Sequence, residues 1–317
     1  MKLSTTEALR ADGLDPHVVE RIVRAALDED LGPQRLDVTS VATIPPDQVD
    51  TADLVARADG VLAGIAVAMA VFDVADELAA TKDAASGRRT VEMVVRARDG
   101  ERVARGDVLA TVTGPTRSLL TAERTALNLI CRMSGVATHT RAWADALAGT
   151  KAMVLDTRKT TPGLRVLEKY AVRAGGGTNK RMGLYDVAMI KDNHTLAAGG
   201  LTAAYRRVRE AFPEVPIQVE VTTVAEAVEA VEAGADFLLC DNMDPRSLAE
   251  VVAVVGDRAE LEATGGLTLE VAAEYAATGV DYLSVGALTH SSPILDIALD
   301  LRPAGVGRDG TDLRPQG

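Results

Sequence analysis

The stretch that decides the fold of this chain is PIQVEVTTVAEAVEAVEAGADFLLCDN, residues 216–242. The short apolar runs Ile217–Val221 and Phe237–Leu239 predict two buried strands. Between them, Val224–Ala233 places alanine and valine at helical spacing among glutamates, which predicts an amphipathic helix. Two short strands joined by one helix are typical of a parallel βα unit.

The same alternation runs through the whole second half of the chain. Short apolar runs predict strands at 153–155, 187–190, 217–221, 237–239, 259–261 and 282–285. Amphipathic windows predict helices between them at 201–212, 224–233, 245–255 and 269–278. About six βα units are enough for a closed or nearly closed parallel barrel, so the fold class is α/β.

The first third of the chain lacks this regularity and predicts a separate α+β domain. A helix is expected from Asp15 to about Asp30, β-like runs at 52–57 and 91–97, a small hairpin within 100–114, and a long helix from Thr116. We therefore divide the chain into residues 1–130, an N-terminal α/β domain, and 131–290, the βα barrel. Residues 291–302 are predicted as a C-terminal helix returning to the N-terminal domain, and 303–317 as a loose tail.

Composition excludes several classes of protein. The 317 residues are 47% apolar and 25% charged, and 34 Lys and Arg against 46 Asp and Glu give a net charge of −12. Binding to nucleic acid or to an anionic membrane surface needs a basic face, so neither partner is expected. The longest uncharged apolar stretch, Gly60–Phe72, is too short to span a bilayer, and no signal peptide is recognisable. With two distant cysteines, Cys131 and Cys240, a reducing cytoplasmic location is expected.

Polar residues follow every predicted barrel strand. The strand ends carry Asp156-Thr-Arg158-Lys159, Lys191–His194, Glu220, Asp241-Asn242, Glu262–Gly266 and Ser284–Gly286. The carboxyl ends of parallel barrel strands meet on one rim, which is where active sites of this architecture are built. The alternative, solvated loop charge at each position, becomes improbable when all six strands share the feature.

A basic segment stands out in this acidic protein. Residues 156–194 contain eight basic and four acidic side chains, a net charge of +4, which leaves −16 for the remainder. Such a concentration of positive charge predicts a pocket for a polyanionic small molecule, since arginine forks and lysine ammonium groups bind carboxylate and phosphate. Part of the segment, Arg165–Arg173, has helical spacing and fits an exposed, salt-bridged helix face instead.

Two carboxylates and two glycine-containing turns suggest how a phosphorylated ligand would bind. Glu220 and Asp241 end neighbouring strands, and magnesium commonly takes one or two such carboxylates together with substrate phosphates. Gly265-Gly266 and Ser284-Val-Gly286 could offer backbone amides to a phosphate, although glycine after a strand is also common for steric reasons. The absence of Walker, Gly-x-Ser-x-Gly and His-Glu-x-x-His motifs argues against a P-loop enzyme, a triad hydrolase and a zinc protease.

A set of motifs in order along the chain closely resembles the quinolinate phosphoribosyltransferase family over roughly residues 15–300. These motifs are Glu123-Arg-Thr-Ala-Leu-Asn128, Ser134-Gly-Val-Ala-Thr138, Asp156-Thr-Arg-Lys-Thr-Thr-Pro-Gly-Leu-Arg165, Glu168-Lys-Tyr-Ala171, and the run 175–194 ending in Ile-Lys-Asp-Asn-His. The resemblance implies an N-terminal α/β sandwich-like domain plus an incomplete parallel βα barrel, assembled as a homodimer or a higher oligomer. It also implies transfer of phosphoribose from phosphoribosyl pyrophosphate to quinolinate with magnesium. The products are nicotinate mononucleotide, pyrophosphate and carbon dioxide, a step of de novo NAD biosynthesis.

The resemblance also implies roles for particular residues. The two carboxylates of quinolinate would be bound by Arg158, Lys159, Lys180, Arg181 and Lys191, with Arg124 donated by the partner subunit. Glu220 and Asp241 would hold the ribose hydroxyls and magnesium, so that Lys159, Lys191, Glu220 and Asp241 form the catalytic set. The donor's phosphate would lie against Thr264, Gly265, Gly266, Ser284, Val285, Gly286, Ala287 and His290.

Two departures from the family pattern bear on the prediction. Lys180 stands where the family usually has histidine, and Thr264 where it usually has serine. Lysine keeps the positive charge without titrating near neutral pH, so carboxylate binding with a changed pH profile is expected. Three alternatives stay open: a relative of the same fold associated with molybdenum transport, a Schiff-base lyase using Lys159 or Lys191, and a non-catalytic anion sensor.

Overall fold

The computed structural model describes residues 1–80 and 90–302, which form two compact units. The first unit contains residues 1–138 and 166–174 and the described residues from Pro293 on, and the second contains 139–165 and 175–292. The predicted boundary at 130 lies eight residues before the observed end of the first stretch at 138, and the one at 290 lies two residues before 292. Residues 166–174, predicted as part of the barrel, belong to the first unit. The predicted tail, 303–317, lies outside the described residues.

A four-stranded antiparallel sheet forms the centre of the first unit. Its order is β12-β1-β5-β3, with β1 Val49–Ala56, β3 Glu92–Val95, β5 Val108–Pro115 and β12 Ile297–Arg302. The helices of the unit are α1 Leu3–Ala11, α2 Pro16–Leu31, α3 Val38–Thr43, α4 Ile65–Ala80, the start of α5 Thr116–Ala146, and α6 Arg165–Ala174 from its second residue. The helices predicted from Asp15 to about Asp30 and from Thr116 are confirmed, the first shifted by one residue at each end.

The prediction of a C-terminal helix over 291–302 is wrong, because the end of this segment is strand β12. It pairs antiparallel with β1, from Thr51 opposite Arg302 to Ala56 opposite Ile297. The large apolar residues Ile297, Leu299 and Leu301 occupy every second position, a period of two that suits a strand rather than a helix. The side chain of Arg302 reaches across to Asp53 of β1, with Nη2 2.9 Å from Oδ1. The chain therefore returns to the first unit as a strand.

The small hairpin predicted within 100–114 does not form either. The two-residue strand β4, Arg102–Val103, pairs with β2, Gly60–Val61, and not with β5. Both edges of β5 are already occupied, one by β1 and the other by β3. Closeness in sequence favours pairing of 102–103 with β5. In the structure β5 instead pairs with β1 and β3, which are longer strands than β4.

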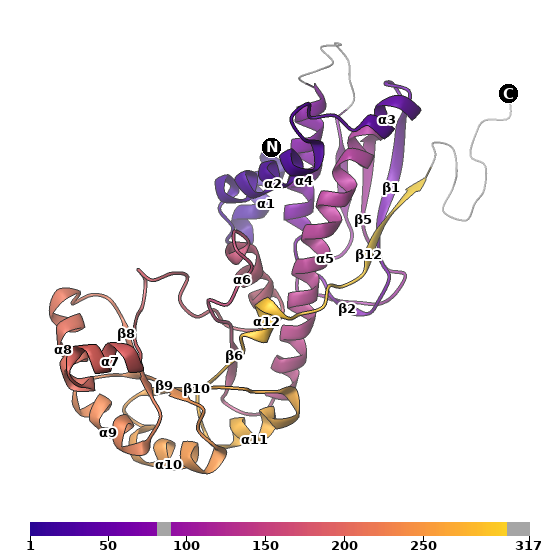
Figure 1. The fold of residues 1–317 in the computed structure, drawn as a ribbon. Helices are drawn as coiled ribbons and strands as arrows, with labels where there is room; N and C mark the ends of the chain where they lie inside the picture. Colours follow the sequence, from indigo (N-terminus) through magenta and orange to yellow (C-terminus); the bar gives the residue numbers. More distant parts are fainter. Residues whose placement is uncertain (81–89, 303–317) are drawn as a thin grey trace. The chain divides into compact units, whose positions relative to one another are not determined.

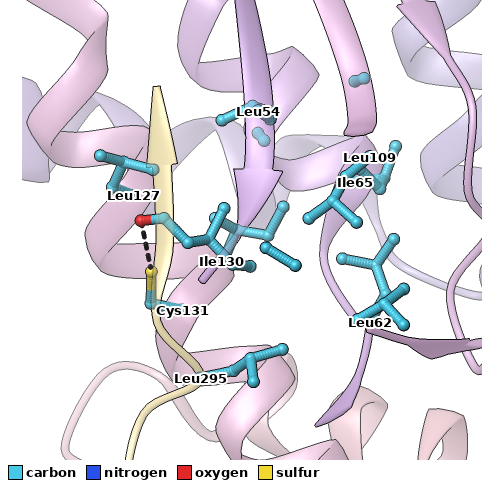
Figure 2. Packing of buried hydrophobic residues seen from close by; sticks show 13 residues of the cluster. Leu54, Leu62, Ile65, Leu109, Leu127, Ile130, Cys131 and Leu295 are labelled. Carbon is cyan, nitrogen blue, oxygen red and sulfur yellow. Dashed lines mark hydrogen bonds between the residues drawn. The ribbon is translucent and has the colours of Figure 1, made fainter. Parts of the chain in front are cut away.

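The core of the first unit is drawn together from distant parts of the chain. Figure 2 shows Leu54 of β1, Leu62, Ile65 and Leu109 packed with Leu127, Ile130 and Cys131 of α5 and with Leu295. The Cys131 thiol donates to the carbonyl of Ile297 at 3.6 Å, and burial raises its pKa. Cys131 and Cys240 are both free and buried, so they contribute as small apolar residues.

The second unit is a parallel βα structure that does not close. Its six strands follow the order β6-β11-β10-β9-β8-β7, with β6 Met153–Leu155, β7 Ala188–Ile190, β8 Ile217–Val221, β9 Phe237–Asp241, β10 Glu260–Thr264 and β11 Tyr282–Ser284. The helices are α7 Asp192–Ala198, α8 Leu201–Ala211, α9 Val224–Glu232, α10 Pro245–Val255, the 3₁₀ turn η1 Leu269–Val271, α11 Ala272–Ala277 and α12 Ala287–His290. In Figure 1 the helices α8 to α11 form an arc around the strands. All six predicted strands are confirmed, and the open edges at β6 and β7 make this an incomplete barrel.

Candidate functional site

A cavity of about 190 Å³ opens at the carboxyl edge of the parallel sheet, entirely within the second unit. Its walls are Thr157, Arg158, Lys159, Lys180, Arg181, Met189, Lys191, Glu220, Leu239, Asp241, Glu262, Thr264 and Ser284. Most of these residues end a strand or follow one directly, so the parallel topology brings them to one place. Five cations and three carboxylates make the cavity a site for small anions.

Asp156 organises the loop that carries two of the cations. Its side chain is buried at the end of β6, and Oδ2 accepts from Asn179 Nδ2 at 2.8 Å. Oδ1 accepts from the backbone amide of Lys180 at 2.7 Å. These two hydrogen bonds fix the loop that places Lys180 and Arg181 at the cavity. Asp156 therefore positions the two cations and does not line the cavity itself.

The cations of the cavity differ in how they are held. Lys191 Nζ lies 3.2 Å from Glu220 Oε2, and the Arg181 guanidinium donates to the carbonyl of Val187 at 3.0 Å. Burial, and then the positive charge of Arg158, lowers the pKa of Arg181. The Nε of Arg158 is buried and has no hydrogen-bond partner among the described residues. An arginine in this state is suited to bind an anion that enters the cavity.

Glu262 is a charged wall residue to which the sequence assigns no role. A single acid in an apolar strand carries little signal, even at the strand end 262–266. In the structure its side chain is fully buried and accepts from Lys180 Nζ and from Gln218 Nε2, each at 2.6 Å. Ser284 Oγ also donates to it. The only sequence signal was the charge itself, between Leu261 and Ala263.

The residues predicted to hold a phosphate are only partly at the cavity. Thr264 and Ser284 line it, whereas Gly265, Gly266, Val285, Gly286, Ala287 and His290 do not. The single hydroxyl proton of Ser284 goes to Glu262, which leaves that oxygen as an acceptor. Gly286 lies against Lys159 and His290, since a Cβ built there would be 3.0 Å from Lys159 Cδ and 3.2 Å from His290 Nε2. The second glycine turn therefore adjoins the cation wall.

The turn after β10 requires glycine at its first position. Gly265 has a φ of +104°, and a Cβ built there would lie 2.2 Å from Asn242 Oδ1 and 2.9 Å from the Asn242 amide nitrogen. We expect Gly265→Ala to lower the free energy of unfolding by at least about 2 kcal/mol, because strain and the clash add. Gly266→Ala is the matched control, since its φ of +59° also strains an alanine backbone but nothing lies within 4 Å, so it lacks the clash and should cost less. Equal urea midpoints for the two variants would contradict this account.

Arg124 lies in the other unit. It is an exposed residue of α5, and the cavity described above is built without it. The prediction that it serves an active site therefore concerns an assembly of two chains.

A wider apolar groove adjoins the cavity. Its volume is about 800 Å³, and it shares Arg158, Arg181, Met189 and Lys191 with the cavity. Two of its lining side chains are strongly exposed, Leu184 at 74% and Tyr185 at 79%. Apolar side chains exposed beside a charged site are typical of a surface that another chain or a ligand covers.

The donor set for a metal is small. Glu220 and Asp241 are the two carboxylates at the cavity apart from the engaged Glu262, and no group of three or more histidine, cysteine, aspartate or glutamate side chains suited to a metal occurs within residues 1–80 and 90–302. Two carboxylates fit magnesium that arrives already bound to the phosphates of a substrate. No helix in these same residues is long and apolar enough to cross a membrane.

An incomplete parallel βα barrel with a cationic cavity and the carboxylates of Glu220 and Asp241 at its rim defines a class of enzyme that acts on small phosphorylated anions. Comparison with known proteins is more specific. Residues 37–134 match the family description "Quinolinate phosphoribosyl transferase, N-terminal domain", and residues 136–300 match the corresponding C-terminal domain. This chain belongs to the quinolinate phosphoribosyltransferase family.

Individual relatives agree over nearly the whole chain. The nicotinate-nucleotide pyrophosphorylase [carboxylating] of Mycobacterium leprae is 49% identical over 282 residues, which are 88% of this chain and 95% of the relative. The probable enzyme of the same name from Bacillus subtilis is 42% identical over 86% of this chain and 90% of the relative. The crystal structure of NadC from Streptococcus pyogenes superposes with a TM-score of 0.84 at 35% identity, covering 92% of this chain and 98% of that one.

Proposed function

We infer that this chain catalyses transfer of phosphoribose from phosphoribosyl pyrophosphate to quinolinate with loss of carbon dioxide, giving nicotinate mononucleotide and pyrophosphate. The observation that carries this inference is the cavity, where five cations face two carboxylates at the rim of a barrel of this family. The cations can bind the two carboxylates of quinolinate. The carboxylates can bind the ribose hydroxyls of phosphoribosyl pyrophosphate and the magnesium that accompanies it. Relatives that are named for this reaction align with 88% of this chain.

The direct test supplies quinolinate, phosphoribosyl pyrophosphate and magnesium and measures released carbon dioxide and nicotinate mononucleotide. A parallel reaction replaces quinolinate by nicotinate. We expect product from quinolinate alone, because the site offers cations for two carboxylates. Equal product from nicotinate, or none from either acceptor in folded protein, would overturn the assignment. In the second case the molybdenum-transport relative and the anion sensor become the leading alternatives.

Quinolinate is proposed to bind between Arg158, Lys159, Lys180, Arg181 and Lys191. Arg158 is the leading contact, because its buried Nε has no partner in the described chain and its guanidinium can meet a carboxylate as a fork. Lys191 Nζ is paired with Glu220 at 3.2 Å, so it is placed as a member of a charge pair at the cavity and not as an isolated amine.

The chemistry proposed for the site is positioning and charge stabilisation. The lone pair of the pyridine nitrogen forms a bond to the anomeric carbon as the bond from that carbon to the pyrophosphate oxygen breaks, and pyrophosphate leaves with the electron pair. Glu220 and Asp241 face the positive charge that develops on the ribose, and Lys159 and Lys191 face the leaving group. The bond from ring carbon 2 to its carboxylate then breaks and carbon dioxide leaves. The electron pair stays on carbon 2, stabilised by the adjacent positive nitrogen, until that carbon takes a proton from water.

Magnesium is proposed to reach the site as the complex of phosphoribosyl pyrophosphate, with Glu220 and Asp241 as its protein ligands. We expect Asp241→Asn to raise the magnesium concentration needed for half-maximal activity at least about tenfold, because one of only two anionic ligands is lost. Activity titrated with magnesium at saturating substrates measures this. Asp244→Asn, which removes only a helix-capping carboxylate of α10, is the control. An unchanged magnesium requirement in Asp241→Asn would contradict the ligand assignment.

Phosphate of the donor is proposed to lie against Thr264 and the turns 264–266 and 284–287, with His290 close by. The Ser284 hydroxyl is not proposed as a donor to this phosphate, since its proton is already donated to Glu262. Backbone amides of the turns and the Thr264 hydroxyl are the donors that fit a phosphate.

We further propose a homodimer in which Arg124 of each chain completes the cavity of its partner, as the basis for dimers or higher assemblies. An exposed arginine on α5 and an exposed apolar groove beside the cavity both fit this arrangement. The acidic net charge and the two free, buried cysteines are consistent with a cytoplasmic protein that binds neither nucleic acid nor membrane.

A further inference from the structure

The least expected feature of the site is the buried carboxylate of Glu262. It lies in β10, between neighbouring strands β9 and β11, and its side chain is 0% exposed. An isolated buried carboxylate is strongly unfavourable, so its surroundings must supply donors. Three separate parts of the chain do so: the loop that carries Lys180, strand β8 through Gln218, and the end of β11 through Ser284.

The bond to Lys180 is the one that concerns the substrate. Lys180 Nζ lies 2.6 Å from Glu262 Oε1, and the lysine side chain is only 10% exposed although it lines the cavity. Burial lowers the pKa of Lys180, the charge of Glu262 raises it, and Arg181 and Lys191 lower it again. Glu262 is the counter-ion that opposes burial and two neighbouring cations.

We propose that Glu262 is the positioning residue of the quinolinate site, holding the Lys180 ammonium against the cavity wall where it meets a carboxylate of the substrate. An ammonium group has three donors, and a bond from one of them to a fixed buried acceptor restricts the directions of the other two. Glu262 acts through Lys180 and does not itself touch quinolinate. The proposal rests on the proposed function, because it takes quinolinate as the ligand.

The structure indicates a variant that removes the charge and keeps the fold. Glu262→Gln retains an acceptor for Ser284 and introduces an amide beside Gln218. The Oε1 of Gln218 is buried without a partner in the described chain, so a flip of the Gln218 amide lets this oxygen accept from the new NH₂ group. The flip leaves the Gln218 amide nitrogen where its unpaired oxygen was, so one buried group stays unpaired, as in the wild type. The new amide oxygen can still accept from Ser284 and Lys180, and the variant removes the negative charge that holds the Lys180 ammonium.

A double-mutant cycle tests the coupling. Wild type, Glu262→Gln, Lys180→Met and the double variant are compared by KM for quinolinate, KM for phosphoribosyl pyrophosphate and kcat. Equilibrium binding of quinolinate is measured for the same four proteins. We expect each single variant to raise the KM and Kd for quinolinate about tenfold and to leave the KM for phosphoribosyl pyrophosphate within about twofold. The double variant should match Lys180→Met within about twofold in quinolinate binding, because the proposal lets Glu262 act on quinolinate only through Lys180.

Glu168→Gln is the matched control. It also removes the charge of a buried acid from an ion pair, with Arg132 Nη2 2.8 Å from Glu168 Oε1, but it does so in the first unit. We expect it to lower Tm without changing the ratio of the two KM values. Normal quinolinate binding in Glu262→Gln, or single effects that multiply in the double variant, would overturn the positioning role. Wild type that binds quinolinate without turnover would overturn the proposed reaction alone, and wild type that does not bind quinolinate would overturn both.

Discussion

Arg158→Ala is expected to lower kcat/KM for quinolinate at least about 100-fold. Removing one member of a buried, charge-assisted contact typically costs about 2–5 kcal/mol, and each 1.4 kcal/mol corresponds to a factor of about ten. Arg158 borders both the cavity and the adjoining groove, and its buried Nε has no partner in the described chain. An anion in the cavity would therefore satisfy a donor that otherwise stays unpaired.

Two further variants give this expectation its controls. Arg158→Lys keeps the charge but loses the planar fork, so an intermediate loss is expected. Arg246→Ala removes an arginine of the same unit whose side chain is 91% exposed, and it should leave kcat/KM unchanged. Steady-state kinetics with quinolinate varied at saturating phosphoribosyl pyrophosphate measure all three. Near-normal turnover in Arg158→Ala would contradict the assignment of this wall of the cavity to quinolinate.

The second large effect is expected from Arg124, through the proposed dimer. Arg124→Ala and Arg158→Ala should each retain less than about 1% of wild-type activity when assayed alone. If each cavity combines Arg158 of one chain with Arg124 of the other, a heterodimer of the two variants contains one cavity with both lesions and one intact cavity. Equal mixing with random reassortment then restores about a quarter of wild-type activity.

Subunit exchange after mild denaturation, or co-expression with two different tags, provides the mixed sample. Each variant exchanged with itself is the control and should stay inactive. A mixture no more active than its components would contradict sharing of the site between chains. Full activity of Arg124→Ala alone would remove this residue from the site altogether.

Local sequence patterns predicted the second unit well, because each of its elements is amphipathic or apolar over a short stretch. The strands Ile217–Val221 and Met153–Leu155 and the helix Pro245–Val255 have the predicted bounds. In a parallel βα structure each strand is buried and each helix covers it, so periodicity along the chain is enough.

The first unit was predicted less well because its strands find partners far away in sequence. β12 pairs with β1 across about 250 residues, and β4 pairs with β2 rather than with the adjacent β5. Helix α4 was not predicted as a helix, since its apolar residues fall on nearly every side and leave no polar face to show the period.

The sequence by itself determined the βα barrel, the family and the set of cations and carboxylates at the rim, because these follow from residue type and position at strand ends. Only the tertiary structure decided which of those groups are already paired. Glu262 engages Lys180 and Ser284, Glu220 engages Lys191, and the Nε of Arg158 is left without a partner among the described residues. The physical reason is that residue type alone shows whether a side chain is charged. Whether that charge is paired depends on its distance to a side chain on another strand, and only the fold sets that distance.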